Sequence, residues 1–181
     1  MALSLLMNFV GSSVEAAPSA TCTGSKRALV VQGLLPKRFR GGFENTTLEL
    51  MKDLTARGYS VEFLREPSWS DVRERMIDNP CLAAFGFVGE GVEDDSATSN
   101  VNDREYDLMY LRENEGIFAN DVRGWLNGKS LEVVVIHACQ QGAQNNRMKW
   151  LNAFGFPTKT FKAWAYNVRS YDTYWWQYFW N

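Results

Sequence analysis

Hydrophobic positions along the chain form short, uninterrupted runs that alternate with stretches of helical spacing. Residues 28–33, 82–89 and 131–137 are almost wholly apolar, as is typical of strands covered on both faces. The run 131–137 is the richest in β-branched residues, so we expect it to lie centrally in the sheet. Residues 60–65 alternate apolar and polar positions, which indicates a strand near a sheet edge, and residues 160–166 are expected to form a further strand.

The segments between these runs predict helices over residues 43–57, 67–78, 118–127, 145–154 and 170–180. In the first of them, the spacing of Leu48, Met51, Leu54 and Thr55 places these residues on one face. Because parallel neighbouring strands need crossover connections, the alternation of strands and helices predicts an α/β fold with a mainly parallel sheet between helices. We expect one domain over residues 28–181.

Residues 90–115 interrupt the alternation with a long polar segment. Its acidic and asparagine-rich composition indicates that it lies outside the core, and residues 106–111 within it are expected to form a small hairpin arm.

The first residues have the pattern of an export signal. Residues 2–10 are apolar, and Val14-Glu15-Ala16 fits the small-x-small pattern that precedes signal peptidase cleavage. We therefore expect a signal peptide over residues 1–16, an extension over residues 17–27, and a secreted or periplasmic protein. The alternative is a disordered leader. No later apolar stretch is long enough to cross a bilayer.

Charge and composition argue against nucleic-acid binding and against a metal or cofactor site. Lys and Arg number 19 against 21 Asp and Glu, and no basic run is present, which argues against a nucleic-acid partner. One histidine and three dispersed cysteines predict no metal site, and the chain lacks a phosphate-binding glycine motif, so we expect no cofactor. An odd number of cysteines in an exported protein suggests one pair and one free thiol.

Two strand ends are marked by glycine turns, one at residues 88–91 and one at residues 137–142. Functional groups of parallel sheets collect at such carboxyl ends, where glycine lets backbone N–H groups approach a substrate. Cys139 follows the second strand and is well placed to attack a carbonyl group held above the sheet. The alternative is a buried structural cysteine.

The run VVVIHACQQG, residues 133–142, resembles the nucleophile segment of caspase-like cysteine peptidases, which include caspases and metacaspases. Their signature is Q-A-C-[RQG]-G. Ala138, Cys139 and Gln140 match it, whereas His137 replaces the first Gln and Gly142 comes one residue late. Residues 82–91 are similar to the family strand that ends in Ser-Gly-His-Gly. The resemblance implies a three-layer α/β/α sandwich and a peptide or protein as partner.

The resemblance also implies roles for individual residues. Cys139 would be the nucleophile, and Glu90 stands where the family has its catalytic histidine. A carboxylate repels a thiolate and acts as a base only where burial raises its pKa. The residues expected to contact substrate are Gly89, His137, Gln140 and Arg40. For His137 the alternative is a semi-buried, hydrogen-bonded residue beneath the loops, and for Arg40 it is a solvated loop arginine.

The family's sheet further implies a Cys22–Cys81 disulfide, since these residues precede two strands that are adjacent and parallel there. The aromatic helix over residues 170–180 would carry a homodimer or partner surface if its second face is exposed. Three functions follow as hypotheses: a catalytically impaired domain that binds a peptide or protein, an active cysteine endopeptidase with a non-standard base, and an extracytoplasmic interaction module.

Overall fold

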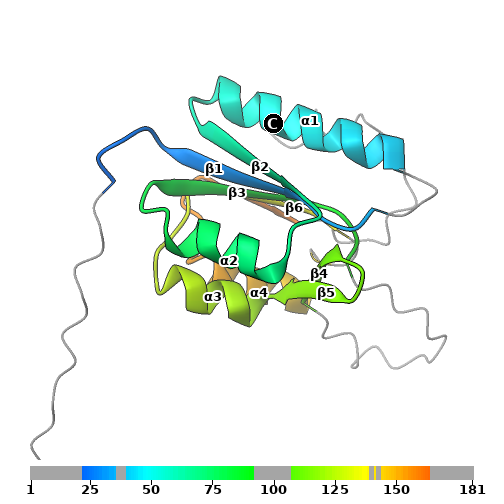
Figure 1. Ribbon diagram of the computed structural model, residues 1–181. Coiled ribbons are helices and arrows are strands. Elements are labelled where there is room, and N and C mark those ends of the chain that lie inside the picture. The colour runs from blue at the N-terminus through cyan, green and yellow to red at the C-terminus, as the bar shows by residue number, and fades with distance from the viewer. Residues whose placement is uncertain (1–21, 36–39, 92–106, 139–140, 142–143, 164–181) are drawn as a thin grey trace, which may run out of the picture.

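A parallel sheet of five strands forms the centre of the protein (Figure 1). The computed structural model describes residues 22–35, 40–91, 107–138, 141 and 144–163. The strands lie in the order β2 (Ser60–Arg65), β1 (Arg27–Gln32), β3 (Leu82–Val88), β6 (Val133–His137) and β7 (Thr160–Ala163). Each pair of neighbours is parallel. The predicted α/β class and parallel sheet are therefore confirmed, with β2 at an edge and β6 inside the sheet.

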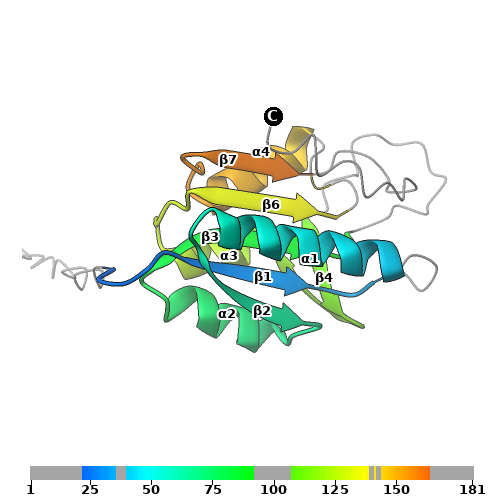
Figure 2. The same cartoon turned by 90° about the horizontal axis from the view of Figure 1, so that it is seen from above.

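Helices cover both faces of this sheet. Helix α1 (Arg40–Ala56) lies on one face, and α2 (Trp69–Ile77), α3 (Ala119–Leu126) and α4 (Gln144–Ala153) lie on the other (Figures 1 and 2). Helix α2 begins where the Ser68 side chain accepts a hydrogen bond from the backbone N–H of Asp71, and Asp71 accepts one from the N–H of Ser68. The protein is thus a three-layer α/β/α sandwich.

Two apolar layers form because successive strand residues point to opposite faces. Leu29, Phe85 and Val134 face the three-helix side, and Val30, Ala84 and Val135 face α1. All six side chains are at most 1% exposed. The continuous apolar runs in the sequence are explained by this coverage of both faces.

The buried face of α1 differs from the expected one. Leu54 is buried as predicted, but Leu48 is 53% exposed, and Leu50 is buried in its place. Gly86 of β3 accommodates Leu50, since a Cβ atom at that position would lie 2.5 Å from Leu50 Cδ2. The absence of a side chain at Gly86 therefore leaves the space that Leu50 fills in the core.

The expected hairpin is present, but it contributes to the core. Strands β4 (Leu108–Arg112) and β5 (Glu115–Phe118) pair antiparallel. Met109 and Leu111 are fully buried in the layer shared with α2, α3 and α4. The expectation that residues 90–115 lie outside the core is thus wrong for these two residues, because the charged composition of the whole segment conceals a short alternating strand.

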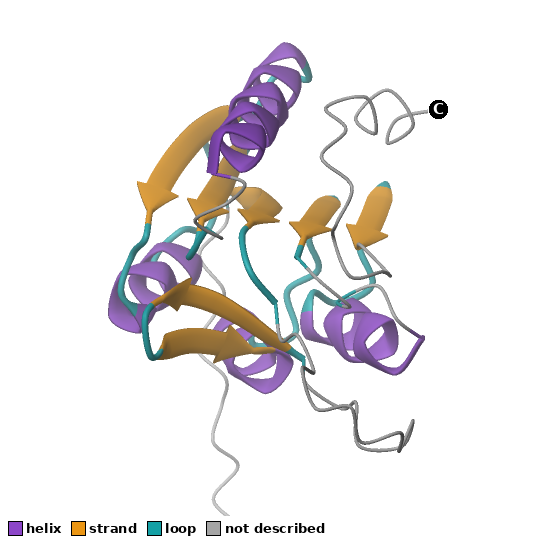
Figure 3. Cartoon of the chain, turned by 90° about the vertical axis from the view of Figure 1, so that its right-hand side faces the viewer, coloured by secondary structure: helices purple, strands orange, loops and turns teal. Residues whose placement is uncertain are grey.

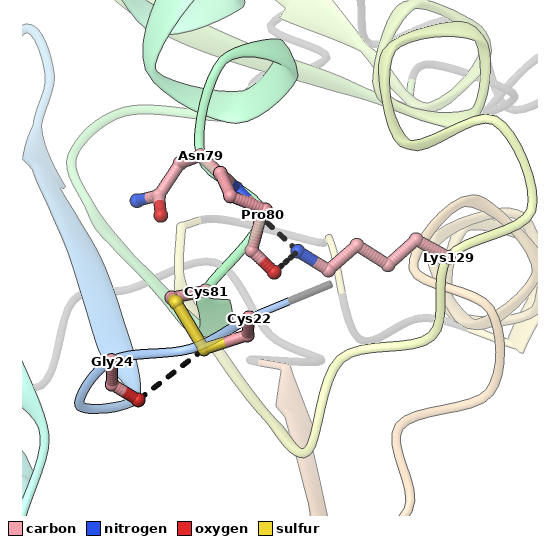
Figure 4. Close-up of a disulfide and its surroundings, with 6 residues drawn as sticks. All are labelled: Cys22, Gly24, Asn79, Pro80, Cys81 and Lys129. Carbon is pink, nitrogen blue, oxygen red and sulfur yellow. Dashed lines mark hydrogen bonds between the residues drawn. A yellow bond between two sulfur atoms is a disulfide. The ribbon is translucent and has the colours of Figure 1, made fainter. Parts of the chain in front are cut away.

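A disulfide links the two segments that enter β1 and β3 (Figure 4). The sulfur atoms of Cys22 and Cys81 lie 2.10 Å apart, which is the pairing that the caspase-like resemblance implies. Next to it, the ammonium group of Lys129 donates hydrogen bonds to the carbonyl groups of Asn79 (3.0 Å) and Pro80 (2.9 Å). The amino edge of the sheet is therefore fastened both covalently and by hydrogen bonds.

Several sequence expectations fall outside the described residues. They are the signal peptide over residues 1–16, the first part of the extension over residues 17–27, the end of the strand predicted over residues 160–166, and the aromatic helix over residues 170–180 with its dimer surface. In the ranges that are described, no helix has the length and apolar character needed to span a membrane.

Candidate functional site

The carboxyl ends of β3 and β6 meet side by side, which brings together two of the segments singled out in the sequence (Figure 3). Val88 pairs with His137, and the N–H of Gly89 donates a hydrogen bond to the carbonyl of His137 at 3.0 Å. Glu90 follows directly and is half-buried. Gly89, Glu90 and His137 thus belong to one continuous edge.

The backbone of this edge is held by the neighbouring segments. The N–H of Glu90 donates to the carbonyl of Leu34 at 2.8 Å, and the carbonyl of Glu90 accepts from the N–H of Tyr110 at 3.0 Å. The N–H groups of Gly89 and Glu90 are therefore engaged within the protein, unlike the substrate-facing amides expected at this turn. Glycine at 89 allows close packing here, since a Cβ atom would lie 3.0 Å from Phe87 Cζ and 3.1 Å from the carbonyl oxygen of Leu34.

His137 lies in the apolar layer between β6 and α1. Its side chain is only 4% exposed, and its ring contacts that of Phe43 edge-on, with centroids 5.2 Å apart. Burial lowers the pKa of His137 to about 3, because the charged form loses its hydration. The imidazole is therefore neutral at physiological pH. It is more enclosed than the semi-buried residue that the sequence suggested as an alternative.

Arg40 is the first residue of α1 and is exposed. Its guanidinium group lies 3.8 Å from the carboxylate of Glu66, just beyond the edge strand β2. Although Phe43, one turn further along α1, contacts His137, the ion pair of Arg40 is made on the β2 side of the sheet. Binding of an anionic substrate group by Arg40 stays a prediction.

Cys139 and Gln140 lie outside the described residues, but the residues on both sides of them are placed. Ala138 and Gln141 are each fully buried, and the Gln141 side-chain oxygen accepts a hydrogen bond from the indole N–H of Trp150 at 2.7 Å. Gln141 is not among the residues that the sequence singles out. The burial of Gln141 depends on its packing against α4, which its place in the sequence does not reveal.

Within the described part of the chain, no group of three or more His, Cys, Asp or Glu residues is arranged to hold a metal ion. Comparison of the chain with protein-family models, with curated proteins and with solved structures finds no match. The parallel sheet and its helical layers are compatible with the caspase-like fold that the sequence suggests.

Proposed function

We propose that this chain is an exported caspase-like protein that binds a peptide or protein and is catalytically impaired. The short motif around Cys139 and the parallel α/β/α architecture support the family. The Cys22–Cys81 disulfide supports export, because disulfides persist mainly in oxidising compartments outside the cytosol.

The proposal that catalysis is impaired rests on the environment of His137, the only histidine in the sequence. A cysteine becomes a strong nucleophile when a neighbouring cation lowers the pKa of its thiol and a base takes its proton. His137 is enclosed against Phe43, and its depressed pKa keeps it uncharged. Glu90, in the position of the family's histidine, would repel a thiolate. These features support a site without an activated nucleophile.

The pH dependence of Cys139 alkylation tests this directly. Because the other two cysteines are joined to each other, Cys139 is the one thiol that iodoacetamide can label in the oxidised protein. We expect its pKa to lie at or above the ordinary value of about 8.5, or labelling to be absent in the folded protein. Cys139→Ala provides the unlabelled control.

A peptide library separates the impaired protein from the active alternative. We expect peptides to be captured equally by the wild-type protein and by Cys139→Ala, with no cleavage. Cleavage that requires Cys139, together with a thiol pKa well below about 8.5, would instead establish an active cysteine endopeptidase with a non-standard base. Absence of both capture and cleavage contradicts a peptide-directed function.

A further inference from the structure

A groove of about 690 Å³ lies between α3 and α4, and most of its lining residues are at or just beyond the carboxyl-terminal ends of these helices. Both helices run back toward the amino edge of the sheet, where β6 and β7 begin (Figures 1 and 2). The groove is therefore on the opposite side from Glu90 and His137, and a ligand bound in it would be independent of the proposed peptide-binding function.

The electrostatics of the groove favour a neutral ligand. Arg123 and Lys129 are the charged side chains among the described residues that line it, which include no carboxylate, and they disfavour cations. The ammonium group of Lys129 already donates hydrogen bonds to the carbonyl groups of Asn79 and Pro80. The positive charge of Arg123 is partly offset by the partial negative charge at the ends of the two helices. The groove therefore disfavours cations and gains little from an anion, which leaves a ligand without net charge as the best match.

The polar lining suits hydroxyl groups in particular. Asn120, Asn127 and Asn152 line the groove and are all exposed. Each side-chain amide offers both donors and an acceptor, as each hydroxyl group of a ligand does in return. A surface with three such amides can match several hydroxyl groups at once, whereas an apolar ligand would leave these amides without hydrogen bonds.

An aromatic ring is presented at the same groove by an unusual backbone conformation. Phe156 has a φ of +52° and is 57% exposed, although a bulky residue rarely adopts the left-handed region. Two hydrogen bonds hold this conformation: the N–H of Phe156 donates to the carbonyl of Leu151 at 2.8 Å, and the N–H of Gly155 donates to that of Asn152 at 3.2 Å. The apolar C–H face of a sugar ring could pack on such a ring.

From these features we infer that the groove binds a neutral saccharide, with the Phe156 ring as platform and the asparagine amides as hydrogen-bonding partners. The volume lies within the range of about 300–1,000 Å³ typical of small-molecule sites. This is wide enough for more than one sugar unit.

Amide-resolved NMR titration of the oxidised full-length protein tests the inference. The neutral probes are maltose, cellobiose, lactose and N,N′-diacetylchitobiose, and the charged probes are digalacturonate and the glucosamine dimer. We expect at least one neutral disaccharide to cause saturable shifts at Gly124, Gly128 and Gly155, with the charged probes binding more weakly.

The variant Phe156→Asn removes the ring while keeping a residue that tolerates the left-handed conformation, so folding is preserved. It should weaken binding about tenfold, and Phe156→Tyr should retain it. Phe118→Ala, which removes another exposed phenylalanine outside the groove, should change nothing. The inference is overturned by no saturable shifts with any neutral probe up to about 20 mM, by preference for a charged probe, or by unchanged binding in Phe156→Asn.

Discussion

At the scale of single residues, burial in the fold strongly lowers the pKa of His137. Its imidazole lies in an apolar layer against Phe43, where the neutral form is tolerated and the protonated form is not. Since the chain contains one histidine, the stability of the protein at mildly acidic pH reports largely on this side chain.

We expect the free energy of unfolding to fall as the pH drops below about 6.5. The unfolded chain takes up a proton on His137 near that pH, whereas the folded chain resists protonation down to a pKa of about 3. Stability is therefore complete above the unfolded pKa and is lost as the pH falls toward the folded one, with a slope of up to about 1.4 kcal/mol per pH unit.

Urea unfolding between about pH 7.5 and 5 measures this slope, in a range above that in which carboxylates take up protons. His137→Asn is the control, and it should show a flat dependence over the same range. Glu132 does not interfere: hydrogen bonds from Lys26 and Lys159 lower its pKa to about 2, so its contribution is lost only below about pH 4.5. An equal slope in the variant would contradict the assignment to His137.

At the scale of elements, the β4–β5 hairpin closes the carboxyl edge of the sheet through backbone contacts. Tyr110 of β4 accepts a hydrogen bond from the N–H of Leu34 and donates one to the carbonyl of Glu90. The hairpin comes this close because residue 33 is glycine: a Cβ atom there would lie 2.1 Å from the Tyr110 carbonyl oxygen and 2.6 Å from Phe87 Cζ.

Gly33→Ala should therefore displace the hairpin and lower the free energy of unfolding by about 1–3 kcal/mol, the usual cost of overpacking. Hydrogen exchange at the amides of Leu34 and Tyr110 should accelerate. Gly41→Ala is the matched control, because a Cβ atom at residue 41 meets nothing within 4 Å and alanine favours the helix. Equal stability of the two variants would show that the close approach at Gly33 is unimportant.

At the scale of the whole molecule, the disulfide joins the segment before β1 to the segment before β3. Cys22 and Cys81 are 59 residues apart, and the enclosed chain contains β1, α1, β2 and α2. Cross-linking a loop of this length restricts the unfolded chain and so stabilises the folded one.

The double variant Cys22→Ser with Cys81→Ser should unfold with a free energy lower by about 4 kcal/mol, as loop-closure entropy suggests. Reduction of the wild-type protein should produce a similar loss, and Cys139→Ala should leave the oxidised protein unaffected. Urea unfolding under oxidising and reducing conditions measures these differences. Insensitivity to the reductant would mean that the hydrogen bonds of Lys129 and the sheet hold this edge without the disulfide.

Much of the architecture is predictable from local pattern alone. The five strands of the sheet and the helices α1–α4 lie where apolar runs and helical spacing indicate them. A strand buried on both faces has a continuous apolar run, and a helix buried on one face has apolar residues at helical spacing. The edge position of β2 and the interior position of β6 follow from the same kind of pattern: alternating residues in β2 and a continuous apolar run in β6. The site is less predictable: Gly89, Glu90 and His137 do share one edge, but the engagement of the Gly89 and Glu90 amides is not visible in the sequence.

Most helices and strands of this protein can be located from the order of residues alone, since backbone preference and burial pattern act over a few neighbouring residues. The three-dimensional packing sets which contacts those elements make. It selected Leu50 over Leu48 for the core, buried Met109 of a largely polar segment, and enclosed His137 against Phe43. These outcomes depend on glycines and side chains from distant segments, such as Gly86 opposite Leu50, and such long-range packing leaves no periodic signal in the local sequence.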